Sequence, residues 1–118
     1  MGTDIHPYLE IKHGGTWRYV GSLERGRNYD FFSALSGVRG DGNDGYFYSD
    51  GGLPDDCSDY VREESEGNHS FTIVSFKGLC EFNKEHEDTS FDSHVWEIIM
   101  KPLAEFCDDM RVVVSYDS

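Results

Sequence analysis

The chain has 118 residues, of which 28% are charged and 37% hydrophobic, and its formal net charge is -13. A compact body of that charge repels nucleic acids and anionic membranes, and it attracts basic surfaces over about 8–10 Å at ordinary salt. We therefore expect no direct binding to nucleic acid or to a membrane, and we expect a basic protein as the partner.

The negative charge is concentrated in the later part of the chain. Residues 1–40 hold five Lys and Arg against four Asp and Glu, whereas residues 41–118 hold nineteen acids against five bases. The three cysteines form no C-x-x-C pair, which favours reduced thiols in the cytoplasm. The first residues lack the features of a secretory signal, and the length predicts one domain, residues 1–118.

The N-terminal segment has the pattern of a β-hairpin. Apolar and polar residues alternate over residues 5–12, which is typical of a strand with its polar side toward solvent or a cleft. Residues 13–15 supply the turn, and residues 17–20 form the returning strand. Pro7 has no N–H group, so we expect this first strand to lie at a sheet edge or to be interrupted there.

Short helices and a loop are expected in the middle of the chain. Asp30 can cap a helix that ends just before Gly40. Residues 40–52 are rich in glycine and aspartate, the composition of a loop or an irregular hairpin. Pro54 suits the first position of an acidic helix over residues 54–65.

A strand and a short helix follow. Residues 70–74 have the composition of a strand, and Ser75 can cap a helix that continues through Cys80. The charged residues 83–92 are then expected to form a connector.

The last elements complete the expected fold. Apolar residues recur every three or four positions over residues 93–109, which predicts the longest helix, with a kink or restart at Pro102. Residues 111–116 are apolar on both faces and predict a central strand. The order predicts an α+β fold, a small and mainly antiparallel sheet with helices packed on one face.

Asp4 and His6 are the sharpest chemical candidates. Two residues apart on a strand, their side chains point to the same side, and Glu10 shares that face. If the last strand pairs antiparallel with the first, Asp117 approaches both. Such a group could hold a divalent metal or act as an acid–base pair. The alternative is that Asp4 satisfies backbone donors and that His6 is an ordinary surface residue.

Spaced carboxylates and aromatic residues form a second candidate site. Aromatic anchors inside a charged rim are typical of protein interfaces, although an acidic helix can also be a merely solvated face. The candidate partner-binding residues are Asp41, Asp44, Tyr46, Tyr48, Asp55, Asp56, Asp59, Glu63, Glu64 and Glu66.

Short patches along the chain resemble a known family. They are Met1-Gly-Thr-Asp-Ile-His6 with Glu10, Arg27-Asn-Tyr29 with Phe32 and Leu35, Val38-Arg39, Gly52-Leu-Pro-Asp55 with Ser58, and Arg111-Val-Val-Val114 with Asp117. This pattern is similar to small uncharacterised phage and prophage proteins, many of which begin Met-Gly-Cys-Asp-Ile-His. Thr3 departs from the usual Cys, and Pro7 interrupts the first strand. The resemblance implies a phage or mobile-element origin and no activity.

Two hypotheses follow, besides the alternative of a stable accessory protein whose charge provides solubility alone. The first is a small acidic phage protein that binds and inhibits a basic, nucleic-acid-binding host defence protein, as anti-CRISPR and anti-restriction proteins do, and that needs no cofactor. The second is a divalent-metal-dependent hydrolase of a nucleotide or phosphate ester. Asp4, His6 and Asp117 would then be ligands or acid–base groups, with His69 assisting and Arg39 holding phosphate.

Overall fold

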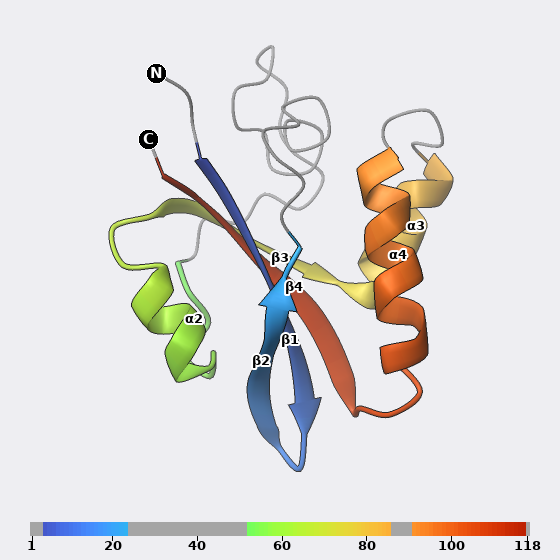
Figure 1. Cartoon of the computed structure of the whole chain (residues 1–118), viewed down its shortest axis with the longest axis horizontal. Coiled ribbons are helices and arrows are strands. Elements are labelled where there is room, and N and C mark those ends of the chain that lie inside the picture. The colour runs from blue at the N-terminus through green and yellow to red at the C-terminus, as the bar shows by residue number, and fades with distance from the viewer. Residues whose placement is uncertain (1–3, 24–51, 86–90, 118) are drawn as a thin grey trace.

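The protein has an α+β fold, as predicted, in a computed structural model that describes residues 4–23, 52–85 and 91–117. Within these residues, four antiparallel strands form one sheet in the order β2-β1-β4-β3, and three helices, α2, α3 and α4, pack around it (Figure 1). The helix expected after Asp30 and nearly all of the loop expected over residues 40–52 lie outside the described residues.

The N-terminal hairpin is confirmed. Strand β1 spans Asp4–His13 and strand β2 spans Thr16–Ser22. Gly14 and Gly15 both have positive φ, 65° and 82°, which is the backbone conformation that a tight two-residue hairpin turn requires. Only glycine adopts it at two successive positions without strain, so the Gly-Gly pair sets the register of the hairpin.

Strand β1 is continuous and lies between β2 and β4, so the expectation of an edge or interrupted strand at Pro7 was wrong. The carbonyl oxygen of Pro7 accepts a hydrogen bond from the N–H of Leu23 at 2.9 Å, just beyond the last residue of β2. The N and C=O of one strand residue face the same side. The missing N–H of Pro7 therefore faces the side on which β2 ends, and no sheet hydrogen bond is lost toward β4.

Strand β4, Asp109–Asp117, is central, as predicted. It pairs antiparallel with β1 from Asp4↔Asp117 to Lys12↔Asp109, and antiparallel with β3, His69–Ser75. Every residue between its two terminal aspartates is buried, because helices cover both faces of the sheet at this strand.

Helices α3, Phe76–Glu85, and α4, Phe91–Leu103, pack on one face of the sheet. The hydroxyl of Ser75 accepts from the N–H of Gly78 at 3.0 Å, so the predicted cap is present. The helices nevertheless end elsewhere than expected. Helix α3 continues to residue 85, and α4 ends at residue 103 rather than 109, where the N–H groups of Glu105 and Phe106 bond three residues back instead of four.

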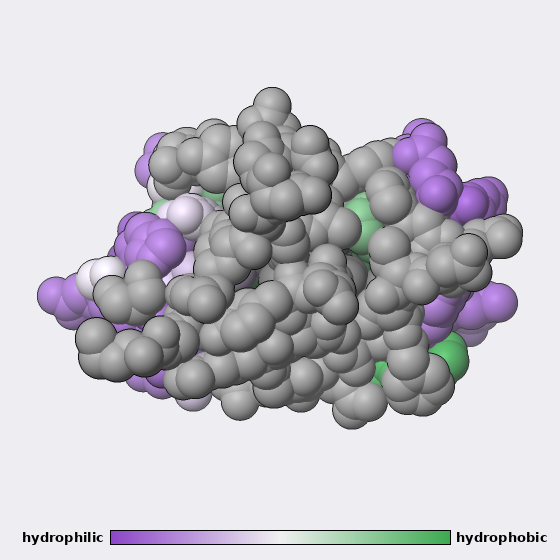
Figure 2. Space-filling model, turned by 90° about the horizontal axis from the view of Figure 1, so that it is seen from above, coloured by the Kyte–Doolittle hydropathy of each residue, from purple (hydrophilic) through white to green (hydrophobic). Residues whose placement is uncertain are grey.

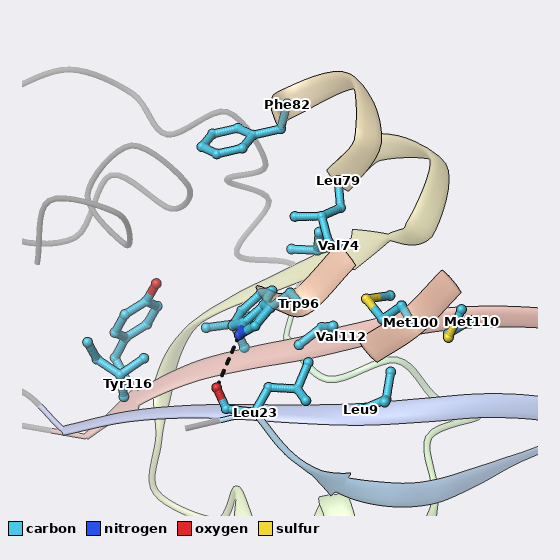
Figure 3. Packing of buried hydrophobic residues seen from close by; sticks show 12 residues of the cluster. Leu9, Leu23, Val74, Leu79, Phe82, Trp96, Met100, Met110, Val112 and Tyr116 are labelled. Atoms are coloured by element: carbon cyan, nitrogen blue, oxygen red, sulfur yellow. Dashed lines mark hydrogen bonds between the residues drawn. The ribbon is translucent and has the colours of Figure 1, made fainter. Parts of the chain in front are cut away.

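The main hydrophobic core lies between these two helices and the sheet (Figure 3). The indole N–H of Trp96, which is 0% exposed, donates to the carbonyl oxygen of Leu23 at 3.1 Å, so even its one polar atom is satisfied. The buried members of this core are Ile5, Leu9, Leu23, Val74, Leu79, Phe82, Trp96, Met100, Met110, Val112, Val114 and Tyr116.

Helix α2, Asp59–Glu64, lies on the opposite face of the sheet. Its buried Val61 packs against Tyr8 and Val113, which alternate with the core residues of β1 and β4 and therefore point to the other side. The expectation of helices on one face holds only for α3 and α4. Figure 1 shows α2 and the α3–α4 pair on opposite sides of the strands.

The α2 helix is also shorter than the predicted helix over residues 54–65. Ser58 is its N-cap, and its hydroxyl accepts from the N–H of Val61 at 3.4 Å. The residues before it form a turn closed by a 3.2 Å hydrogen bond from the N–H of Cys57 to the carbonyl of Pro54. A serine cap competes for the helix start more strongly than a proline four residues earlier, since it satisfies a backbone donor. No helix in the described part of the chain is long and apolar enough to cross a membrane.

Candidate functional site

A buried ion pair lies beneath α2. The side chain of Glu10 is 0% exposed, and one of its oxygens accepts from Nε of Arg111 at 2.8 Å. The other oxygen accepts from the backbone N–H of Ser58, the cap of α2, at 2.7 Å. Both carboxylate oxygens are therefore used, one to bind β4 and the other to hold the start of α2.

Arg111 is enclosed by two further side chains. Its guanidinium carbon lies 3.8 Å from the ring centroid of Trp17, and Nη2 lies 3.2 Å from Oδ1 of Asp56. The indole N–H of Trp17 donates to Oδ2 of the same Asp56 at 3.0 Å. These five residues, Glu10, Trp17, Asp56, Ser58 and Arg111, join strands β1, β2 and β4 and the turn before α2 to the start of that helix, and we call them the polar pin.

The polar pin shifts the ionisation of Asp56. Its partial burial raises the pKa, but the charge of Arg111 and the hydrogen bonds from Arg111 and Trp17 together lower the pKa below its usual value. Asp56 was expected to contact a partner. Its side chain is 62% exposed, and its two oxygens have internal partners, which join the turn before α2 to β2 and β4.

Tyrosines cover the rest of this face. The rings of Tyr19, from β2, and Tyr60, from α2, stack at 4.2 Å between centroids, and Tyr8 meets both edge-on. Tyr60 remains 42% exposed. The nearby carboxylate of Glu64 and the contact with Tyr19 raise the pKa of Tyr60, so its hydroxyl is protonated at neutral pH. The stack gives α2 an exposed aromatic edge.

Exposed carboxylates lie along the segment that carries this aromatic edge. Between residues 52 and 68 the sequence holds six acids and one base, Arg62, whose guanidinium donates to the backbone carbonyl of Asp55 at 2.8 Å. Hydrophilic residues gather at the left end of Figure 2, the side on which Figure 1 places α2. The exposed acids of this segment other than Asp56, which we call the acidic surface, are Asp55, Asp59, Glu63, Glu64 and Glu66.

These five acids were all among the predicted partner-binding residues. Of the other five candidates, Asp56 belongs to the polar pin, and Asp41, Asp44, Tyr46 and Tyr48 lie outside the described residues. The structure adds Tyr60 and Tyr19, which the sequence did not single out, as aromatic neighbours of the acids.

The first and last strands meet as the sequence suggested. Asp4 pairs in register with Asp117, and Nε2 of His6 lies 3.9 Å from Oδ2 of Asp117. The His6 ring is stacked on Tyr8, with centroids 6.3 Å apart. Glu10 lies on the same face, as predicted, but its two carboxylate oxygens accept hydrogen bonds from Arg111 and Ser58. Within the described residues, no three His, Cys, Asp or Glu side chains form a group that could hold a metal.

His69 is not brought to this pair. It lies opposite Tyr116 in the register of β3 and β4, and the two rings are 6.3 Å apart. Tyr116 belongs to the core under α3 and α4, so His69 is directed to the other face from His6 and Asp117. Its Nδ1 instead contacts the hydroxyl of Ser70 at 2.8 Å. Arg39, the expected phosphate ligand, lies outside the described residues.

Sequence reasoning missed the polar pin. A signal was present, because antiparallel pairing of the first and last strands places Glu10 directly opposite Arg111. The two residues are 101 positions apart, so the pair becomes visible only once the strand register is known. Comparison of the chain with protein-family models, with curated proteins and with solved structures found no match.

Proposed function

We propose that this protein is an acidic binding protein whose acidic surface occupies a basic, nucleic-acid-binding surface of another protein. One observation carries the proposal. Five exposed carboxylates project from a short segment around α2 that a buried ion pair holds against the sheet. Carboxylates in fixed positions can replace the phosphates of a nucleic acid as partners for Lys and Arg.

The polar pin supports this function through preorganisation. Association costs less when the contacting groups are already ordered before the partner arrives. A helix of six residues is too short to be stable by itself, so its order depends on its contacts with the sheet. The Tyr19–Tyr60 stack adds an exposed aromatic ring beside the acids, on which an arginine of the partner can stack.

The partner we propose is a nucleic-acid-binding defence component of a host cell, of the CRISPR or restriction type. The resemblance to phage proteins favours a host target, and the net charge of -13 favours a target that normally binds a polyanion. Inhibition would follow from competition, because the protein and the nucleic acid would need the same basic surface.

Affinity capture from host lysate at low and high salt tests the proposal. We expect a stoichiometric nucleic-acid-binding protein that is retained at low salt, lost at high salt and displaced by added DNA or RNA. The variant Glu63→Gln/Glu64→Gln/Glu66→Gln should weaken binding by tenfold or more. These acids lie at the C-terminal end of α2, where neutralising them does not weaken the helix.

A matched control separates the acidic surface from total charge. The variant Glu81→Gln/Glu85→Gln/Glu105→Gln removes the same charge from exposed positions in α3 and after α4, on the other side of the sheet. It should bind as the wild type does. Equal losses in both variants, or binding that does not change with salt, would contradict the proposal.

A second candidate function is acid–base or metal-assisted hydrolysis of a nucleotide or phosphate ester. The observation that favours it is the approach of His6 to Asp117, with Asp4 at the adjoining strand position. His6→Ala should abolish turnover of such a substrate with or without added Mg²⁺ or Mn²⁺, while the fold stays intact. Unchanged hydrolysis by this variant would remove the candidate.

A further inference from the structure

A cavity of about 230 Å³ opens at the end of the sheet remote from Asp4 and Asp117. It lies where β3 passes into α3 and where the chain after α4 enters β4, toward the lower right of Figure 1. None of the residues proposed above for partner binding or hydrolysis lines it. The lining residues are Ser75, Phe76, Lys77, Ala104, Cys107, Asp108, Asp109 and Met110.

The floor of the cavity is apolar and held in place. Phe76, Ala104 and Cys107 pack against the main core, and Met110 is one of its buried members. The thiol of Cys107 donates to the carbonyl of Leu103 at 3.3 Å. The N–H of Asp108 donates to the carbonyl of Lys12 at 2.9 Å, which ties this wall to β1. An apolar group entering the cavity would therefore meet a formed surface.

Opposite charges stand at the rim. Lys77 and Asp108 are exposed and line the same cavity, and within the described residues neither forms an ion pair. Lys77 lies in the first turn of α3, which contains no acid, so the positive end of the helix dipole adds to its charge. Asp109 is partly engaged, since its Oδ1 accepts from the N–H of Met110 at 2.8 Å.

We propose that this cavity binds a small zwitterion with an apolar body, such as a free aliphatic or aromatic amino acid. The apolar group would lie on Phe76, Ala104 and Met110, the carboxylate would face Lys77, and the ammonium would face Asp108. The volume is below the roughly 300–1,000 Å³ of cavities that hold drug-sized ligands, so it suits a ligand of amino-acid size.

Titration of the full ¹⁵N-labelled chain with L-leucine, L-methionine and L-phenylalanine, followed by NMR, tests the site. We expect saturable shifts at residues 75–78 and 104–110 for one or more of the three, with a Kd of about 1 mM or tighter. N-acetyl-L-leucine lacks the ammonium, and 3-methylbutylamine lacks the carboxylate. Each should bind at least about tenfold more weakly than leucine, because each loses one charge-assisted contact.

Two variants assign the two charges. Lys77→Gln should weaken leucine binding about tenfold and leave 3-methylbutylamine unaffected. Asp108→Asn should weaken leucine binding similarly and leave N-acetyl-L-leucine unaffected. Lys101→Gln and Glu105→Gln, at exposed residues that do not line the cavity, are the matched controls and should bind as the wild type does.

Three results would overturn the proposal. They are an absence of saturable shifts for all three amino acids up to about 10 mM, equal binding of leucine and its two analogues, and equal effects of the rim and control variants.

Discussion

The two faces of the sheet are covered by helices that are held in different ways. Over one face, α3 and α4 enclose a continuous apolar core in which Trp96, Leu79 and Phe82 are completely buried. Over the other, α2 contributes one completely buried apolar side chain, Val61, and is joined to the sheet by the Glu10–Arg111 pair.

The difference has a physical meaning. Apolar burial is strong and non-directional, so it suits a face whose task is to keep the domain folded. A buried ion pair adds little net stability compared with apolar residues of the same size, but its hydrogen bonds fix position and direction. The α2 face uses such bonds to set where its exposed carboxylates stand. One face maintains the fold, and the other presents a surface.

The largest expected effect is on the α3–α4 face. Trp96→Ala removes a completely buried side chain and should lower the free energy of unfolding by about 3–5 kcal/mol, measured by urea denaturation. The loss should affect the whole domain, because this core contacts β1, β3 and β4. A loss below about 1 kcal/mol would show that this face does not carry the stability.

Breaking the polar pin should have the next largest effect. Arg111→Met leaves Glu10 buried without its cation, which costs about 3 kcal/mol or more in the folded state. The double variant Glu10→Met/Arg111→Met removes both charges and should be more stable than Arg111→Met alone. Urea denaturation of the three proteins gives the comparison. A double variant that is less stable than the single one would show that Glu10 without Arg111 still stabilises the fold, through its hydrogen bond with the N–H of Ser58.

A smaller effect is expected at the tyrosine stack. Tyr60→Ala removes the ring that lies on Tyr19 and should cost about 1 kcal/mol, since Tyr60 is already 42% exposed. Tyr60→Phe keeps the stack and is the control, with stability close to that of the wild type. If both variants lose the same free energy of unfolding, the hydroxyl rather than the ring of Tyr60 contributes the stability.

The smallest effect is a pH dependence at Asp56. Because its folded-state pKa is lowered below 3.8, ionised Asp56 stabilises the fold above that pH, and this contribution is lost as the pH falls through the folded-state pKa. Thermal melts of the wild type and Asp56→Asn should therefore differ at neutral pH and converge below about pH 3.8. Parallel melting curves at all pH values would exclude this role for Asp56.

The sequence predicted those elements that depend only on residues close to one another in the chain. The Gly14–Gly15 turn and the Ser75 cap each depend on a few neighbouring residues, and both are confirmed. The alternation of residues 5–12 predicted strand β1 correctly, but the expected exposure of its polar side was wrong, because Tyr8 and Glu10 are buried under α2. The run of valines likewise predicted a strand buried on both faces. Antiparallel pairing of this strand with β1 brings Asp117 close to His6, as the sequence predicted.

Features that depend on distant contacts were not predictable in this way. Pro7 is tolerated in a central strand because β2 ends beside it, which the local sequence does not reveal. The α2 helix lies on the face away from α3 and α4 because Glu10, which is paired with Arg111, accepts a hydrogen bond from its cap residue Ser58 there. His69 faces away from His6 because the β3–β4 register shifts between His69 and Thr72.

Hydrogen exchange in wild type and Arg111→Met tests most directly whether the polar pin presents the acidic surface. The N–H groups of Arg62 and Ser65 form hydrogen bonds within α2. They should exchange at least about tenfold faster in the variant, because water can hydrate the unpaired Glu10 carboxylate only when α2 moves away from the sheet. Amides in α3 and α4 should be accelerated by no more than the measured loss of unfolding free energy allows. Unchanged exchange in α2, or a larger acceleration in α3 and α4 than in α2, would contradict the account.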